Sequence, residues 1–309
     1  MRTDGILRLS IPGGQPAVRL AVGTEEGVTF RVTPLHPIAD LRRTARAATP
    51  PREAGKRATD LVELITLDPT IRLDIRYASD NNFMGAAMYS QARAFLQRPA
   101  ADAVVRANRK LKGYGFGLLI HDAYRPWYVT RMFWDATTGA DHEFVANPAT
   151  GSKHNRGAAV DLTLYTLADG TPARMPGGYD EFSHRSYPGY PGGTSLERWR
   201  RDLLRAVLES EGFTVNPSEW WHFDLVGWAQ WPIGNTPFEQ VARRLFARAK
   251  IGDALRERKS IRIAPGLHDV STGLAGRAAR GGCYNRSGIA SRAIADYFID
   301  AAGVFPDPF

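Results

Sequence analysis

One pair of distant motifs constrains this chain more than any other feature, because its side chains can act only if the fold brings them together. The first motif is S-K-H-N-R-G-A-A-V-D at residues 152–161, and the second is E-W-W-H at residues 219–222. Together they hold two imidazoles and two carboxylates, in the pattern H-x-x-G-x-A-x-D followed far downstream by E-x-x-H. This combination is typical of zinc peptidases and predicts one bound Zn²⁺ ion per chain.

Catalytic zinc usually binds three protein side chains and leaves a fourth position to water. His154, Asp161 and His222 provide such a set of ligands. Bound zinc lowers the pKa of its water, but peptide hydrolysis also needs a base that accepts the proton and later passes it to the leaving amine. We expect Glu219 to be this base, with the zinc-bound water as the nucleophile.

The residues around these side chains predict how they are positioned. Gly157 allows a tight bend after the first histidine, and alternating apolar and polar residues over 160–164 predict a strand that carries Asp161. Glu219 and His222 lie three residues apart, so in a regular strand they would point to opposite faces. Both can reach one zinc ion only if the chain bends or bulges there, which the Pro-Ser pair before them favours.

Each of these residues also has an ordinary structural interpretation. A single histidine is more often a surface or core residue than a metal ligand, Asp161 alone could be a turn residue, and Glu219 alone could be a solvated charge. The ordered combination favours the metal site. Trp220, Trp221 and Phe223 are better explained as core and pocket wall than as residues that read the substrate.

The composition is that of an ordinary globular protein, with 43% hydrophobic and 23% charged residues, but the net charge of +8 raises the question of a nucleic-acid partner. Residues 1–59 carry 10 basic and 5 acidic side chains, residues 60–239 carry 18 and 21, and residues 240–309 carry 12 and 6. The basic excess therefore lies outside the segment that holds both motifs. Because no basic motif with interleaved aromatic residues stands out, we expect no nucleic-acid binding.

The sequence contains no run of about 18 apolar residues that could cross a membrane, and its first residues lack the apolar core of a signal peptide. Cys283 is the only cysteine, so no disulfide can form within the chain. This cysteine usage fits a reducing compartment. We therefore expect a cytoplasmic protein with no membrane partner.

Three segments are predicted along the chain. Residues 1–59 form an N-terminal β appendage, with short strands up to about residue 38, followed by a linker or short helix over residues 45–59. Residues 60–239 form the domain that carries both motifs. Residues 240–309 form a C-terminal helical tail of unknown role.

Within residues 60–239, hydrophobic periodicity predicts a mixture of strands and helices. Thr194 and Glu197 have the spacing of a capping box, which marks the start of one helix. The predicted strands are Arg72–Tyr77, Phe116–Ile120 and 159–165, the predicted helices are 101–112, 127–137 and 195–212, and residues 213–226 are expected to form a hairpin.

These motifs and several others resemble the zinc D-alanyl-D-alanine dipeptidases, the VanX-like branch of the D-Ala metallopeptidases. The resemblance covers about residues 60–239 and extends beyond the metal motifs. The further matching stretches are D-I-R-Y-A at 74–78, N-F at 82–83, H-D-A-Y-R-P at 121–126, Y-D-E-F at 179–182 and E-W-W-H-F at 219–223. The resemblance implies an α+β fold with a small central antiparallel sheet flanked by helices.

The resemblance also implies roles for residues whose function the sequence pattern alone does not decide. Arg125, which by itself could form a salt bridge with Asp122, is implied to face the scissile carbonyl oxygen and to stabilise the negative charge that develops there. Asp180, otherwise a turn residue, is implied to bind the free ammonium group of the substrate. Ser152 and Tyr77 match positions that line the substrate.

The leading hypothesis is zinc-dependent hydrolysis of the small dipeptide D-Ala-D-Ala to two D-alanines. The alternatives are a D,D-carboxypeptidase or muramoyl-peptide amidase that acts on cell-wall peptides, or a zinc-binding module without catalysis. The presence of both Arg125 and Glu219 argues against the module. A carboxylate placed for a free amine predicts that acetylation of that amine makes a poor substrate. The sequence indicates neither a protein partner nor an oligomeric state.

Overall fold

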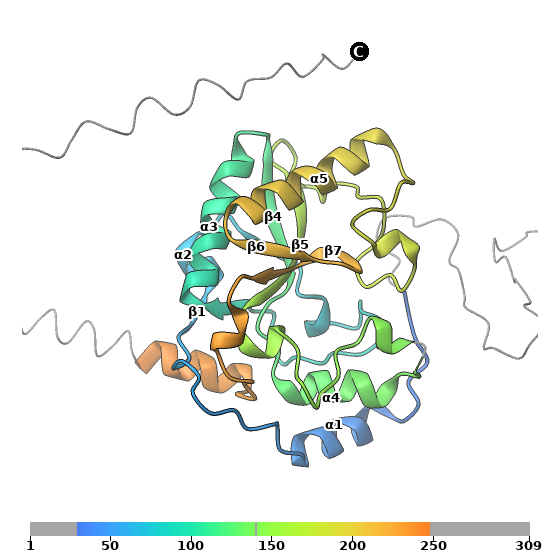
Figure 1. Cartoon of the computed structure of the whole chain (residues 1–309), viewed down its shortest axis with the longest axis vertical. Coiled ribbons are helices and arrows are strands. Elements are labelled where there is room, and N and C mark those ends of the chain that lie inside the picture. The colour runs from blue at the N-terminus through green and yellow to red at the C-terminus, as the bar shows by residue number, and fades with distance from the viewer. Residues whose placement is uncertain (1–29, 140, 248–309) are drawn as a thin grey trace, which may run out of the picture. The chain divides into compact units, whose positions relative to one another are not determined.

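The computed structural model describes residues 30–139 and 141–247 of the chain (Figure 1). Helices and strands are interspersed along this part of the chain, and residues 238–247 at its end are helical. In chain order the named elements are α1 (Ile38–Ala47), β1 (Leu61–Glu63), α2 (Leu64–Leu67), β2 (Arg72–Leu73), β3 (Phe95–Gln97), α3 (Arg98–Lys112), β4 (Phe116–Asp122), α4 (Trp127–Ala136), β5 (Ala159–Thr166), α5 (Ser195–Ser210), β6 (Phe213–Asn216) and β7 (Glu219–Leu225).

Five strands form the central sheet, in the order β2-β4-β5-β7-β6. The pairs β4–β5, β5–β7 and β7–β6 are antiparallel, whereas β2 pairs parallel with β4 at one edge. β1 and β3 form a separate antiparallel pair. The prediction of an α+β fold with a small central antiparallel sheet flanked by helices is therefore confirmed, and the parallel edge strand is an addition to it.

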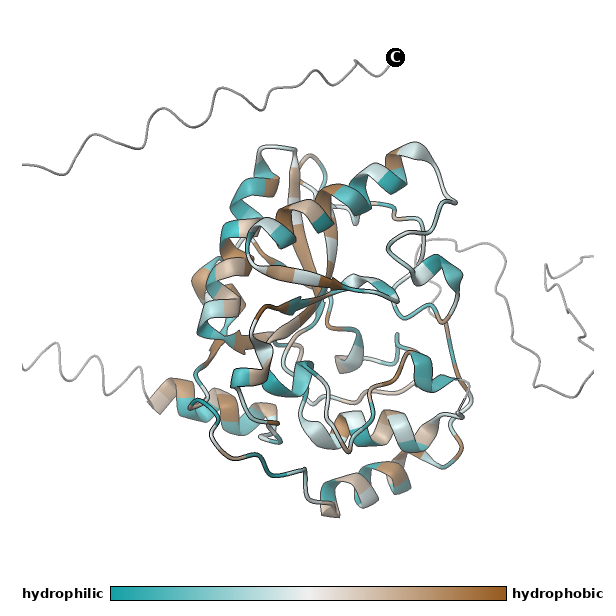
Figure 2. Ribbon diagram, in the orientation of Figure 1, coloured by the Kyte–Doolittle hydropathy of each residue, from teal (hydrophilic) through white to brown (hydrophobic). Residues whose placement is uncertain are grey.

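The alternation along β5 shows how one sheet supports both a core and a site. Val160, Leu162 and Leu164 are fully buried in the hydrophobic core. Asp161 and Thr163 point to the opposite face, because successive side chains of a strand alternate. α3 and α5 contact each other and pack on this sheet, whose central strands are mostly hydrophobic (Figure 2). The polar face is left to carry functional groups.

The predicted capping box is present at the start of α5. The hydroxyl of Thr194 accepts a hydrogen bond from the backbone N–H of Glu197 at 3.2 Å, and the Glu197 carboxylate accepts one from the backbone N–H of Thr194 at 2.7 Å. α5 ends at Ser210, and Gly212 then takes a φ of 89°, which favours glycine. The chain continues directly into the β6–β7 hairpin, as predicted.

The strand predicted over Arg72–Tyr77 is wrong beyond Leu73. β2 holds only two residues, and Arg76–Ala78 form a 3-10 turn. This turn places the ring of Tyr77 against other aromatic rings, with centroids 4.9 Å from Phe133 and 6.1 Å from Phe83. Burial of a large ring outweighs the local alternation that predicted the strand.

Residues 30–59 pack against the rest of the described chain. The backbone N–H of Leu35 donates to the carbonyl of Ala136 at the end of α4, at 2.9 Å. α1 contacts α4 and buries Leu41 and Ala45. This segment is therefore in direct contact with the helix that follows the H-D-A-Y-R-P stretch.

Several predictions for the two ends of the chain lie outside the described residues. The strands predicted before residue 30 belong to this group, and over residues 30–38 the structure has no strand and α1 begins instead. The predicted C-terminal helical tail is described only for residues 240–247, which are helical. Among the described residues, no helix is both long enough and apolar enough to span a membrane.

Candidate active site

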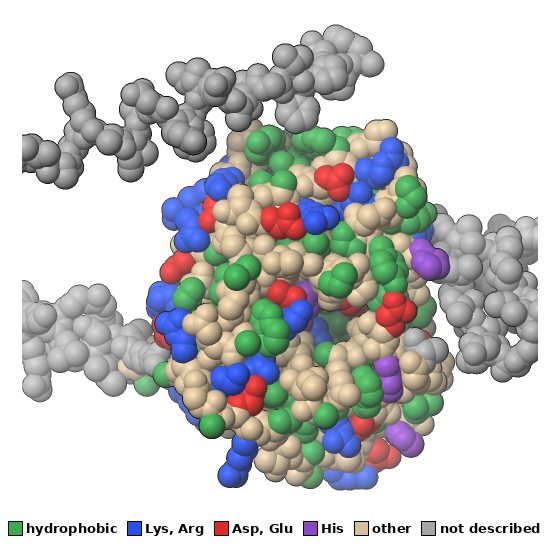
Figure 3. Space-filling view, viewed as in Figure 1, with side chains coloured by type: hydrophobic (Ala, Val, Ile, Leu, Met, Phe, Trp, Pro, Cys, Tyr) green, Lys and Arg blue, Asp and Glu red, His purple; other side chains and the backbone are tan. Residues whose placement is uncertain are grey.

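All the side chains predicted for the site line one cavity of about 350 Å³. They are the candidate ligands His154, Asp161 and His222, together with Tyr77, Arg125, Ser152, Asp180 and Glu219. Figure 3 shows acidic side chains gathered around a hollow on this face of the molecule. The volume falls in the range of small-molecule sites, about 300–1,000 Å³. The fold therefore brings together every residue that the sequence analysis placed in the site.

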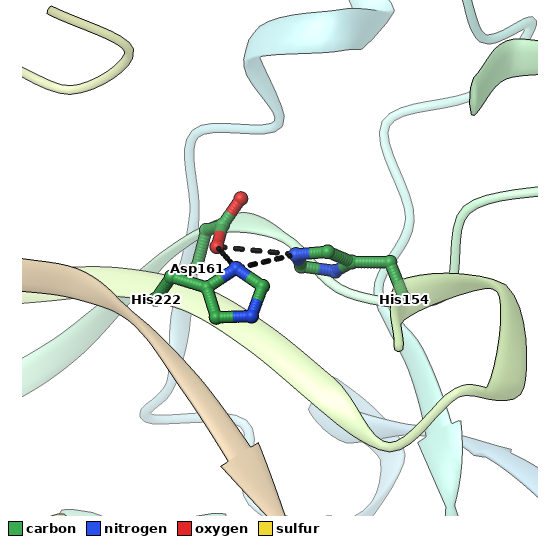
Figure 4. A group of neighbouring side chains, drawn as sticks. All are labelled: His154, Asp161 and His222. Atoms are coloured by element: carbon green, nitrogen blue, oxygen red, sulfur yellow. Dashed lines mark hydrogen bonds and ion pairs between the residues drawn. The ribbon is translucent and has the colours of Figure 1, made fainter. Parts of the chain in front are cut away.

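The three candidate ligands form a compact triangle (Figure 4). Nε2 of His154 lies 3.1 Å from Nδ1 of His222 and 3.2 Å from Oδ1 of Asp161, and the last two atoms are 3.0 Å apart. Asp161 lies directly opposite His222 in the β5–β7 register. His154 comes from the 3-10 turn just before β5. Strand pairing therefore fixes two of the three side chains relative to each other.

A glycine makes the step from His154 to β5 possible. Gly157 has a φ of 65°, in the left-handed region that side chains disfavour. A Cβ at this position would also lie 2.5 Å from a methyl carbon of Leu61. The bend that sequence analysis expected is therefore present, and both backbone conformation and space require glycine there.

The hydrogen bonds of the two imidazoles direct lone pairs into the triangle. Nδ1–H of His154 donates to the carbonyl of Ala123 at 2.7 Å, so in the neutral ring Nε2 carries a lone pair. Nε2–H of His222 donates to Asp224 at 2.9 Å, which leaves the lone pair on Nδ1. Both lone pairs face the carboxylate of Asp161. Three electron-rich atoms this close repel one another unless a cation lies between them. Burial lowers the pKa of His222, but the Asp224 and Asp161 carboxylates raise it well above its usual value, so a proton takes that place in the metal-free site and a bound metal ion would replace it.

Asp161 itself fits such a cation. Its Oδ1 is buried and accepts no hydrogen bond from the described residues, while its Oδ2 accepts one from the hydroxyl of Tyr179 at 3.0 Å. Burial raises the pKa of Asp161, but positive charge at the His154 and His222 rings holds it well below its usual value, and a metal cation between the three residues would have the same effect. Tetrahedral zinc separates its ligand atoms by about 3.3 Å, given bonds of about 2.0–2.1 Å. The triangle is within a few tenths of an ångström of that spacing.

Glu219 reaches the triangle through an irregularity in β7. The β6–β7 register shifts between Val215 and Asn216, so that Asn216 pairs with Glu219. This confirms the bulge that the spacing of Glu219 and His222 required. The Glu219 carboxylate lies 3.5 Å from Nδ1 of His222 and accepts a hydrogen bond from the side-chain amide of Asn216 at 3.0 Å. Burial raises the pKa of Glu219 to about 7.

Arg125 is buried at the cavity, not on the surface, and it also forms the salt bridge with Asp122. Its Nε donates to the Asp122 carboxylate at 2.9 Å, and one terminal nitrogen lies 2.8 Å from the same oxygen. That nitrogen lies 3.8 Å from the carboxylate of Asp161, and the guanidinium sits over the rings of Tyr77 and Phe133. Asp122 therefore holds Arg125 in place beside the candidate ligands.

Asp180 lies across the cavity on a turn in the left-handed region, with a φ of 53°. It is 6% exposed, and one of its oxygens accepts a hydrogen bond from the hydroxyl of Tyr77 at 2.8 Å. Burial and the nearby Asp161 raise the pKa of Asp180 well above its usual value. A positively charged group of a bound molecule placed here would offset both the burial of Asp180 and its repulsion from Asp161. The phenyl rings of Phe83 and Phe182 form the wall next to it.

Ser152 lies at the cavity edge, where its hydroxyl accepts a hydrogen bond from the backbone N–H of His154 at 3.2 Å. Asn155, which sequence reasoning did not assign, links two parts of the site. Its side-chain amide donates to the carbonyl of Arg125 at 2.8 Å and to the hydroxyl of Thr130 at 2.9 Å. The turn that carries His154 is thereby joined to the start of α4.

Tyr179, Asp224 and Asn216 also contact site groups, and sequence reasoning missed the part that each of them plays. For Asp224 a signal was available, since it follows His222 by two residues and strand alternation puts both on one face. Tyr179 and Asn216 carry no comparable local signal. Their contacts depend on how a loop and a hairpin meet the sheet.

Comparisons with known proteins agree with this geometry. A family model described as D-ala-D-ala dipeptidase matches residues 57–244. The D-alanyl-D-alanine dipeptidase of Escherichia coli is 36% identical over 175 residues, which cover 57% of this chain and 89% of that protein. The corresponding protein of Streptomyces coelicolor is 35% identical over 176 residues, and that of Enterococcus faecium is 29% identical over 173 residues; in both, the match covers 50% of this chain and 86% of the relative.

Proposed function

The chain belongs to the D-Ala-D-Ala dipeptidase family, and on this basis we propose that it hydrolyses free D-Ala-D-Ala to two D-alanines with one bound zinc ion. Family membership makes the protein a metallopeptidase that acts on dipeptides. The observation that carries the finer proposal is the triangle of electron-rich atoms from His154, Asp161 and His222, with the carboxylate of Glu219 beside it.

In this proposal His154, Asp161 and His222 hold the metal through one nitrogen or oxygen each. Zinc bound there would polarise the scissile carbonyl and lower the pKa of a water molecule towards neutrality. Asp161 stays ionised in the folded protein, because its pKa is held low by the two imidazoles against the effect of burial. The histidines keep their lone pairs on the cavity side through their outer hydrogen bonds.

Glu219 is the proposed general base. Its carboxylate lies beside the candidate ligands and lines the cavity, and its pKa of about 7 is close to neutral pH. A base with such a pKa can accept a proton from the attacking water and return it to the leaving amine. Asn216 fixes one carboxylate oxygen by a hydrogen bond. That oxygen, Oε2, is also the one that lies 3.5 Å from Nδ1 of His222, so Asn216 holds it beside the candidate ligands.

Arg125 is proposed to stabilise the oxygen anion that forms when water adds to the peptide carbonyl. Its guanidinium is buried, positively charged and held by Asp122 before the substrate arrives. A preorganised cation of this kind acts strongly where water is excluded, since it needs no rearrangement as charge develops. Phe133 and Tyr77 cover its face and keep water away.

Asp180 is proposed to bind the free ammonium group of the dipeptide, and Tyr77 and Ser152 to line the substrate. Without a cation, the buried Asp180 carboxylate has only the hydroxyl of Tyr77 as a described hydrogen-bond partner. An ammonium group would add a charge-assisted hydrogen bond there. The geometry therefore favours a substrate whose amino group is free.

The test is D-alanine release by purified protein of measured zinc content. Free D-Ala-D-Ala should be hydrolysed, a chelator should abolish the reaction, and added zinc should restore it. N-acetyl-D-Ala-D-Ala should be a poor substrate. Comparable catalytic efficiencies for the two substrates would favour the carboxypeptidase alternative. Zinc-loaded protein that releases no D-alanine from either would favour the non-catalytic module.

A further inference from the structure

We propose that Asp224 and Lys153 form a charged support for the ligand His222, and that this support determines how tightly the site holds its metal. The inference rests on the metal site of the proposed function. It concerns positioning residues that act through His222, because neither side chain lines the substrate cavity.

The support consists of two contacts in series. Oδ1 of Asp224 accepts a hydrogen bond from Nε2–H of His222 at 2.9 Å. Oδ2 of Asp224 accepts one from the ammonium group of Lys153, which also lies 5.5 Å from the ring centre of Trp228. Asp224 is buried, with 6% of its surface exposed. The two oxygens of one buried carboxylate are thus divided between a metal ligand and a cation.

Local structure dictates this arrangement. His222 and Asp224 are two residues apart in β7, so both side chains lie on the face of the sheet that carries Asp161. Ala159 is the strand partner of Asp224 on β5, and its small side chain leaves room for the carboxylate. Lys153 directly precedes His154, the other imidazole ligand, in the sequence. The Lys153–Asp224 contact therefore ties together the two segments that supply histidine ligands.

The two histidines differ in what holds their outer nitrogens. His154 donates to the backbone carbonyl of Ala123 at 2.7 Å, and the Asp122 carboxylate lies 3.8 Å from the same nitrogen, beyond hydrogen-bond distance. His222 donates to a carboxylate, and a carboxylate acceptor orients a metal-bound imidazole and makes it a stronger ligand. Lys153 balances the charge of Asp224, so the buried carboxylate is not left unpaired. Asp224 can therefore change how strongly His222 binds the metal.

Zinc affinity measured by chelator competition tests the proposal without relying on activity. Asp224→Ala should weaken zinc binding about 10- to 100-fold, the usual effect of removing such a partner. Asp224→Asn should recover part of this loss, because its carbonyl oxygen can still accept the hydrogen bond from His222. The absorption spectrum of the cobalt-substituted protein should shift in Asp224→Ala, since the orientation of one ligand changes.

Glu211→Gln is the matched control. Glu211 also carries an ion-paired carboxylate whose side chain is only 7% exposed, and it lies just before this hairpin, but it pairs with Arg106 and Lys110 of α3 and contacts none of the candidate ligands. This variant should lower thermal stability and leave zinc affinity and the cobalt spectrum unchanged. Equal loss of zinc affinity in Glu211→Gln and Asp224→Ala would overturn the proposal in favour of a purely structural effect.

Lys153→Met tests whether the lysine acts through Asp224. It should weaken zinc binding less than Asp224→Ala does, and it should cause no further loss in the Asp224→Ala background. An additional loss in the double variant would overturn the serial arrangement. Native protein that binds no zinc would overturn both the proposed function and this inference, whereas tight zinc binding by both native protein and Asp224→Ala would overturn the inference alone.

Discussion

The two walls of the cavity are built by different means. The ligand wall comprises His154, Asp161, His222 and Glu219, and it comes from β5, β7 and the turn before β5. The substrate wall comprises Tyr77, Arg125 and Asp180 with the neighbouring phenyl rings, and it comes from loops, a 3-10 turn and the start and middle of α4. Pairing of β5 with β7 fixes Asp161 and His222 in the first wall, with His154 on the turn just before β5, whereas side-chain contacts fix the second wall.

The two walls also differ in the pKa values of their carboxylates. The pKa of Asp161 is held low by neighbouring imidazoles although burial raises it. Burial and Asp161 together raise the pKa of Asp180. Positive charge at the imidazoles therefore stabilises Asp161 before any substrate arrives. Asp180 has only the hydrogen bond from Tyr77 and the charge of Arg125 to offset its burial, so a bound cation would stabilise it further. Under the proposed function, the first wall is preorganised for a metal and the second is completed by the ammonium group of its substrate.

The largest effect is expected on the ligand wall. Replacing His154, Asp161 or His222 with Ala should abolish both zinc binding and hydrolysis, because each removes one of three ligands and no fourth described side chain joins the triangle. Elemental analysis of the purified variants and a D-alanine assay would check this. A folded variant that kept full zinc occupancy and activity would show that the ligand wall is assigned wrongly.

A smaller effect on the same wall separates chemistry from metal binding. Glu219→Gln keeps the size of the side chain but cannot accept a proton, so turnover should fall about 100- to 10,000-fold. Zinc content should stay at the native value, because Glu219 is not among the three atoms of the triangle. The measurement is kcat at saturating D-Ala-D-Ala together with metal content. Unaltered turnover would remove Glu219 from the mechanism.

The substrate wall should respond differently, through selectivity. Asp180→Asn removes the charge while keeping a residue that tolerates the left-handed backbone at φ 53°. A hydrogen bond to a charged group contributes about 1.5–3 kcal/mol, so kcat/KM for free D-Ala-D-Ala should fall about 10- to 100-fold. The acetylated dipeptide, which lacks the ammonium group, serves as the control and should be little affected. An equal fall for both substrates would mean that Asp180 does not select the free amine.

The contrast between the walls also explains what the sequence could predict. The ligands lie in compact motifs on strands with clear alternation, and the three-residue spacing of Glu219 and His222 was enough to require a bulge that the structure has. The turn at Arg76–Ala78 and the left-handed conformation of Asp180 depend on rings and loops far away in sequence. Local periodicity carries no information about such contacts, so the substrate wall could be predicted only through family resemblance.

The smallest expected effect concerns a contact behind the ligand wall. Both terminal nitrogens of Arg156, two residues after His154, donate to the carboxylate of Glu53 at 2.8 and 2.9 Å. Glu53 also accepts a hydrogen bond from the backbone N–H of Ile233 at 2.9 Å. Burial raises the pKa of Glu53, but these hydrogen bonds and the charges of Arg156 and Lys56 outweigh it, so the pKa is lower than usual.

Glu53→Gln should therefore reduce stability without changing either wall. Folding lowers the pKa of Glu53, so its ionised carboxylate adds to the free energy of unfolding. This contribution is fully present above the unfolded-state pKa of about 4.3 and is lost as the pH falls through the lower pKa of the folded protein. At pH 7 the variant should be less stable by about 1 kcal/mol, since the pair is partly exposed to solvent, which corresponds to a Tm lower by about 2–4 °C. The difference in Tm between native protein and variant should shrink as the pH is lowered below about 4, and thermal unfolding at several pH values would measure it.

Zinc affinity and kcat/KM of the Glu53→Gln variant at neutral pH should match the native values. If zinc affinity fell as well, the N-terminal segment would have to be counted as part of the ligand wall, and strand pairing alone would not account for that wall's rigidity.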